Sequence, residues 1–168
     1  MKTVIVDKIG SITQACGLGH ELRVSGEIPA EEGVVIVAEV LNNKSTYNTL
    51  ELTSGRMAKL GKGDIVVGAL GPRKALFGYS GHVPASLKVG DVIQMLNIGG
   101  VMGVCDSATP DKGKPFDLKV LGGVLNFPYL GERIGVPARV GYRPLAQDTT
   151  LDTRGVPVVA LAGTCMEA

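Results

Sequence analysis

Short apolar runs separated by glycines are the feature that most restricts how this chain can fold. The sequence has 24 glycines among 168 residues, twice the usual share of ~7%. The glycines stand at the ends of apolar runs and do not form low-complexity tracts. Glycine tolerates positive φ at tight turns, and runs of about four to eight residues have the length of strands. The sequence therefore predicts a mainly β fold, a small barrel or compact sandwich with short Gly-rich turns and little helix.

Three segments carry the clearest strand signals. Residues 33–41 (GVVIVAEVL) are rich in β-branched side chains, which favour strands. Residues 47–52 (YNTLEL) and 116–121 (FDLKVL) alternate apolar and polar side chains, which is typical of half-buried strands. We place these strands in a β domain over residues 1–122.

A pattern of Leu, two residues, Gly-Asp and two β-branched residues occurs twice, at 60–66 and at 87–93. In such a turn glycine takes the unusual φ, and aspartate accepts hydrogen bonds from nearby backbone N–H groups. We therefore expect Gly63-Asp64 and Gly90-Asp91 to lie in tight turns that lead into strands. Shared turn chemistry explains the repeat better than a duplicated unit does.

Composition narrows the classes of partner. Apolar residues make up 45% of the chain, which is enough for a core, and 17 basic residues face 16 acidic ones. Nucleic-acid binding usually needs a strongly basic surface or clustered aromatic residues. The sequence has neither, so no nucleic-acid partner is expected. No apolar run approaches the ~20 residues that span a bilayer, so no membrane partner is expected. The N-terminus does not resemble a signal peptide, and we expect a cytoplasmic protein.

The three cysteines are widely spaced, at Cys16, Cys105 and Cys165. No CxxC pair is present, so neither zinc nor dithiol chemistry is expected, and no metal is predicted. A Cys105 nucleophile would need His20 or His82 as its base. Cysteine more commonly packs as a small apolar side chain, and we favour that interpretation.

One Gly-rich segment, residues 71–84 (GPRKALFGYSGHVP), gathers several polar side chains. It could bind an anion or a polar ligand through its charged groups and a histidine that titrates near neutral pH. The alternative, a β-hairpin with solvated charges, is favoured because loops commonly carry polar residues. The candidate ligand-binding residues are Arg73, Lys74, Tyr79, Ser80 and His82.

The remainder of the chain divides into two parts. Residues 123–155 are punctuated by prolines and end in a polar stretch, which indicates an irregular segment and linker. Residues 156–168 (VPVVALAGTCMEA) begin with a dense apolar run that leads directly into Gly163-Thr164. This run is interpreted either as the first strand of a second domain or as the last strand of the β domain.

The segment 156–168 resembles the opening of the P-loop in dethiobiotin-synthetase-like NTPases, in which a buried strand runs into a Gly-Thr that begins the phosphate-binding loop. The resemblance covers half a motif, because the closing Gly-Lys-Thr or Gly-Lys-Ser would follow residue 168. It implies an N-terminal domain before a P-loop NTPase domain, with Gly163 and Thr164 at the start of the phosphate loop. ATP and Mg²⁺ are expected only if that domain follows, and no cofactor is expected in this chain.

The leading functional hypothesis is a non-catalytic accessory domain that binds substrate or mediates assembly. No complete catalytic motif is present, and we expect no catalysis by this chain alone. One alternative is a stand-alone ligand-binding or enzymatic β protein that binds a small molecule through residues 71–84. A third is a structural module that forms homo-oligomers through exposed strand edges.

The half motif predicts that this chain has no tight, magnesium-dependent binding of nucleoside triphosphates. Phosphate capture by a P-loop needs backbone N–H groups from the complete loop, the lysine charge and the first helical turn. Calorimetry with Mg-ATP should therefore give no heat of tight binding. Saturable, magnesium-dependent binding that survives Gly163→Ala and Thr164→Val would contradict the assignment of the loop to these residues.

Overall fold

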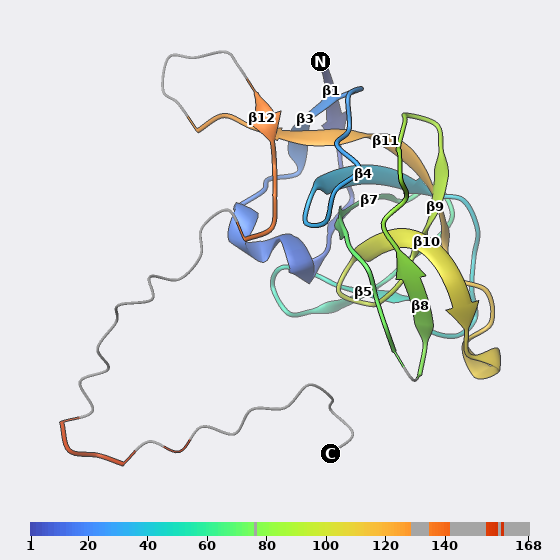
Figure 1. Ribbon diagram of the computed structural model, residues 1–168, viewed down its shortest axis with the longest axis vertical. Helices are drawn as coiled ribbons and strands as arrows, with labels where there is room; N and C mark the ends of the chain where they lie inside the picture. The colour runs from blue at the N-terminus through green and yellow to red at the C-terminus, as the bar shows by residue number, and fades with distance from the viewer. Residues whose placement is uncertain (76, 129–134, 142–153, 158, 160–168) are drawn as a thin grey trace.

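The computed structural model describes residues 1–75, 77–128, 135–141, 154–157 and 159, and these are mainly β (Figure 1). Among them the only helices are two short 3-10 helices, η1 (Ser11–Cys16) and η2 (Pro110–Lys112). The expected fold class is confirmed. The strands in chain order are β1 (Lys2–Ile5), β2 (Lys8–Ile9), β3 (Glu21–Ser25), β4 (Val35–Val40), β5 (Thr49–Glu51), β6 (Met57–Lys59), β7 (Ile65–Leu70), β8 (Tyr79–His82), β9 (Val92–Met95), β10 (Val101–Ala108), β11 (Asp117–Asn126) and β12 (Val136–Pro137).

Five strands pair in a path that returns to its starting strand. β11 is antiparallel to β4, and β4 is antiparallel to β7. β7 is parallel to β10, β10 is antiparallel to β9, and β9 is antiparallel to β11. β3 and β1 extend the sheet from β11, and β8 pairs with the second half of β10. The structure thus combines a ring of strands with a sheet that continues beyond it on two sides.

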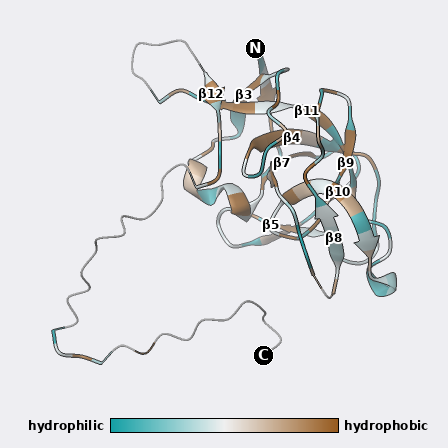
Figure 2. Cartoon of the chain, viewed as in Figure 1, coloured by the Kyte–Doolittle hydropathy of each residue, from teal (hydrophilic) through white to brown (hydrophobic). Residues whose placement is uncertain are grey.

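β4 is buried on both faces, and this divides the apolar side chains into two clusters. Figure 2 shows that much of β4 is apolar (brown). Side chains alternate between the faces of a strand, so Ile36 and Ala38 face one cluster while Val35 and Val37 face the other. The first cluster fills the ring, and the second lies under β1, β3, η1 and residues 135–141. Members of the first cluster include Val66, Leu70, Met95, Met102, Leu118 and Val120, and members of the second include Val6, Leu22, Val24, Val67, Val124 and Ala138.

Both Gly-Asp steps form the expected tight turns before strands. Gly63 and Gly90 take positive φ values of 93° and 95°. Asp64 and Asp91 each accept the backbone N–H three residues earlier, at 2.7 and 2.8 Å. β7 begins directly after the first turn and β9 directly after the second. The turn prediction is therefore confirmed.

The two turns also hold equivalent places on the paired strands β4 and β11. The N–H of Gly63 donates to the oxygen of Val40 in β4, and that of Gly90 donates to the oxygen of Val120 in β11, both at 2.8 Å. The leucine that opens each motif is buried in the ring. The repeated sequence pattern thus marks two turns that deliver β7 and β9 to opposite sides of one antiparallel strand pair.

The β structure continues past the expected boundary at residue 122, which falls inside β11. β12 pairs with the end of β11, and Ala138 is buried in the second cluster. The N–H of Val140 donates to the oxygen of Gly33 at 2.8 Å. Residues 135–141 thus pack on the β domain. Gly163 and Thr164 lie outside the described residues.

Several strand glycines stand where two backbones cross closely. A Cβ added to Gly68 in β7 would overlap the carbonyl oxygen of Gly100. One added to Gly103 in β10 would lie 2.5 Å from the oxygen of His82. A side chain at Gly68 would push β7 from the start of β10, where the ring closes, and one at Gly103 would push β10 from β8. None of the helices among the described residues has the length and apolar character of a membrane span.

We predict that Gly68→Ala lowers the free energy of unfolding by about 1–3 kcal/mol, because the added methyl must displace backbone atoms. Gly19→Ala is the matched control: Gly19 is exposed, and a Cβ there would meet nothing within 4 Å. The control should change stability by less than about 0.5 kcal/mol. Urea denaturation of both variants measures the difference, and equal stabilities would show that the crossing at Gly68 is not tight.

Candidate functional site

Residues 71–75 and 77–84 pair as the two arms of a β-hairpin, which the more conservative interpretation of the sequence expected, but the charge of Arg73 is not solvated as that interpretation held. Arg73 and Gly81 exchange two backbone hydrogen bonds of 2.9 Å each. The second arm of the hairpin is β8, which pairs with β10 (Figure 1). Tyr79, Ser80 and His82 therefore border β10, whereas Arg73 and Lys74 lie on the other arm.

Two of the candidate residues use their polar groups within or beneath the hairpin. The guanidinium of Arg73 donates through Nη1 to the oxygens of Tyr79, at 3.2 Å, and Leu96, at 2.5 Å. Ser80 Oγ exchanges hydrogen bonds with the backbone of Ala75, at 3.2 and 3.3 Å. Lys74 is exposed. Arg73 and Ser80 thus hold the hairpin in shape, and that role accounts for their side-chain contacts.

Tyr79 is buried and joins the hairpin to the segment after β10. Its hydroxyl accepts a hydrogen bond of 2.8 Å from Lys44 Nζ and donates one of 3.0 Å to the oxygen of Lys112. Burial, with smaller contributions from the nearby Tyr47 and Cys105, raises the pKa of Tyr79 to about 12. Its phenol therefore stays protonated at neutral pH and can serve as both donor and acceptor.

Lys44 is a residue of this region that the sequence analysis did not single out. Its Nζ donates to Tyr79 and to the backbone oxygens of Lys112, at 3.0 Å, and Lys114. Burial lowers the pKa of the Lys44 ammonium. One lysine thus fixes both sides of Gly113, about seventy residues away in sequence. Nothing in the local sequence of Lys44 signals this role.

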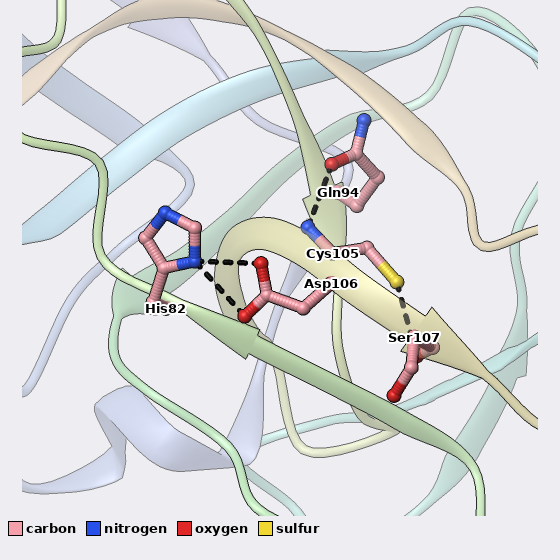
Figure 3. A network of polar contacts seen from close by, with 5 residues as sticks. All are labelled: His82, Gln94, Cys105, Asp106 and Ser107. Atoms are coloured by element: carbon pink, nitrogen blue, oxygen red, sulfur yellow. Dashed lines mark hydrogen bonds and ion pairs between the residues drawn. The ribbon is translucent and has the colours of Figure 1, made fainter.

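A β-bulge in β10 brings Asp106 to His82. The register between β10 and β8 shifts between Cys105 and Ser107, so Asp106 is the extra residue. Figure 3 shows its carboxylate facing the imidazole, with His82 Nδ1 at 2.8 and 2.9 Å from the two oxygens. Both side chains are about half exposed, at 56% and 53%.

Cys105 lies in the same strand but turns away from His82 (Figure 3). Its thiol donates to the oxygen of Ser107 at 3.3 Å. Burial raises the pKa of the Cys105 thiol, and the charge of Asp106 adds to this, although the hydrogen bond to Ser107 acts in the opposite direction. The structure does not bring this thiol to the base that a cysteine nucleophile would need.

A chain of hydrogen bonds continues from Cys105 to a second carboxylate. The backbone N–H of Cys105 donates to Gln94 Oε1, and Gln94 Nε2 donates to Asp117 Oδ1, both at 3.0 Å. These groups border a shallow recess of about 380 Å³ beside β10. Its polar lining consists of Gln94, Cys105, Asp106, Ser107, Lys114 and Asp117.

Residues of both charges line the recess: Lys114 is basic, and Asp106 and Asp117 are acidic. Asp117 is held by Gln94, and the backbone oxygen of Lys114 is held by Lys44. Across the described part of the chain, no three His, Cys, Asp or Glu side chains group as a metal site would require. The arrangement can offer a ligand an ammonium, two carboxylates, a hydroxyl and an amide.

Comparisons of the chain with protein-family models, with curated proteins and with solved structures return no match.

The raised pKa of Tyr79 predicts a loss of stability at alkaline pH. At pH values below the ordinary tyrosine pKa of 10.0, the phenol is protonated in both the folded and the unfolded chain. Between pH 10 and about 12, only the unfolded chain releases the proton. The free energy of unfolding should therefore fall across this window, by about 1–2 kcal/mol from this group.

Tyr79→Phe should remove this part of the pH dependence, and Tyr47→Phe should retain it. Urea denaturation at about pH 9 and about pH 11.5 measures the difference for each protein. An identical pH dependence in wild type and Tyr79→Phe would show that the phenol is not buried as described.

Proposed function

We propose that this chain is a non-catalytic ligand-binding domain whose recess beside β10 binds a small polar molecule carrying both a positive and a negative group. The observation that supports this proposal is the recess itself, in which one basic residue, Lys114, and two acidic residues, Asp106 and Asp117, line one space. A ligand with both charges can pair with each group in turn. Such charge-assisted hydrogen bonds are stronger than neutral ones.

Gln94 and Asp117, on one side of the recess, are held in place without a ligand. Gln94 bridges the backbone of Cys105 and the carboxylate of Asp117, and the N–H of Asp117 donates to Asn42 Oδ1 at 2.8 Å. Fixed side chains lose little conformational entropy when a ligand binds, so more of the interaction energy appears as affinity. This supports recognition of one ligand shape.

The state of Cys105 favours binding over catalysis. A nucleophilic thiol needs a lowered pKa or an adjacent base. Burial raises the pKa of Cys105, and the imidazole of His82 is directed to Asp106. The thiol therefore serves as a hydrogen-bond donor at the wall of the recess.

We propose further that the β domain precedes a P-loop domain and presents its ligand to it. The support is the likeness of residues 156–164 to the opening of a phosphate loop, together with the packing of residues 135–141 onto the β domain shortly before that segment. The residues of this chain do not make a complete site for Mg-ATP, because no lysine follows Gly163 in residues 164–168. ATP and Mg²⁺ would thus belong to the following domain.

We predict that a zwitterionic amino acid binds in the recess, and that Lys114→Met and Asp117→Asn each weaken this binding at least about tenfold. Chemical-shift titration with amino acids, hydroxy acids and simple carboxylates identifies the ligand class. Glu21→Gln and Lys119→Met are the controls, because both side chains are exposed and neither lines the recess. The proposal fails if no zwitterion shifts the recess resonances, or if the controls weaken binding as much as the recess variants.

A further inference from the structure

We propose a second binding site, for an aromatic ring that carries an oxyanion, at the surface where Lys112 lies between Phe77 and Tyr47. Lys112 Nζ is 4.4 Å from the centre of the Phe77 ring and 5.5 Å from that of Tyr47. Phe77 is 46% exposed. The surface thus joins a cation to an accessible aromatic ring.

The ammonium of Lys112 has no carboxylate or hydrogen-bond acceptor against it among the described residues. The two rings hold it by cation–π attraction, which is worth about 0.5–1 kcal/mol at an exposed site. The positive charge of Lys112 therefore contacts the two rings but has no anion paired with it. An oxyanion is the group that would pair with it.

The backbone of Lys112 is held by two hydrogen bonds from side chains beneath the surface. Its carbonyl oxygen accepts hydrogen bonds from both Lys44 Nζ and the hydroxyl of Tyr79, each at 3.0 Å. The ring of Tyr79 in turn packs edge-on against Tyr47, with 5.6 Å between the ring centres. The lysine is thus positioned before any ligand arrives.

Phe77 is held to the same segment by the residue that follows it. The N–H of Thr109 donates to the oxygen of Gly78, and the N–H of Gly78 donates to Thr109 Oγ1, both at 2.8 Å. Gly78, next to Phe77, is therefore tied to Thr109, the residue before η2, close to the contact between Phe77 and Lys112.

Tyr47 adopts a strained backbone to complete the group. Its φ is 51°, in the left-handed region that bulky residues rarely enter. Such residues cost roughly 1–3 kcal/mol and are concentrated at ligand sites, where the surrounding structure holds them. The strain is a second observation, independent of the charge, that marks this surface.

The ligand chemistry follows from these two parts. An oxyanion, either a phosphate monoester or a carboxylate, pairs with Lys112, while the attached ring stacks against Phe77. Asp111 is the one acid of η2. Lys112 and Phe77 do not line the recess beside β10, so this site does not depend on the function proposed there.

Phenyl phosphate and benzoate are the ligands that test the site. Inorganic phosphate and phenol, the two parts of phenyl phosphate, are the comparison ligands. In titrations of the full chain followed by NMR, we expect phenyl phosphate or benzoate to bind at least about tenfold more tightly than phosphate or phenol. The tighter of the two identifies the oxyanion. This binding should not require Mg²⁺.

Phe77→Ala and Lys112→Met should each weaken the binding at least about tenfold without changing Tm beyond a few degrees. Phe127→Ala is the matched control, because Phe127 is a second exposed phenylalanine beside a cation, with Arg23 at 6.0 Å from its ring. The proposal is overturned if neither aromatic anion binds more tightly than the comparison ligands, or if Phe127→Ala lowers the affinity as much as Phe77→Ala. If the recess binds no zwitterion while the surface around Lys112 still binds the aromatic anion, only the function proposed for the recess is contradicted.

Discussion

The parallel pairing of β7 with β10 is the contact on which the remainder of the structure depends. It closes the ring in which β11, β4, β7, β10 and β9 pair in turn and β9 pairs again with β11. This pairing requires Gly68, because any side chain there would overlap the backbone at Gly100. The abundance of glycine in the sequence therefore has a packing reason as well as a conformational one: some glycines make turns, and others let strands cross.

The closed ring explains why the polar groups gather where they do. β10 leaves the ring after Gly103 and continues as the partner of β8, where the bulge directs Asp106 to His82. The segment that follows, η2, is then fixed by Lys44 and Tyr79. The recess and the surface around Lys112 thus flank one short segment, whose position is set by the strands before and after it.

The fold and its turns could be predicted from the sequence because they depend on local patterns. Glycine spacing indicated strands, and the Gly-Asp steps indicated the turns at Gly63 and Gly90. The arrangement of the polar groups could be predicted only in part. The sequence proposed Tyr79 and His82 as candidates, and their ligand-binding role stays a prediction. Lys44 and Asp106 make their contacts with residues 24 to 70 positions away in sequence. Neither a one-residue bulge nor a hydrogen bond from a lysine to a distant carbonyl produces a repeating pattern in the sequence. Sequence patterns therefore cannot predict them.

The rigidity of the segment that joins the two proposed sites is the property both depend on, and amide hydrogen exchange of the unliganded chain measures it most directly. The N–H groups of Gly78 and Thr109, which tie the hairpin to η2, should be protected to a degree comparable with that of Ala69, whose N–H donates to Gly100 in the ring at 3.0 Å. Exchange of the Gly78 and Thr109 amides at the rate of an unstructured chain, with Ala69 protected, would contradict a preformed site.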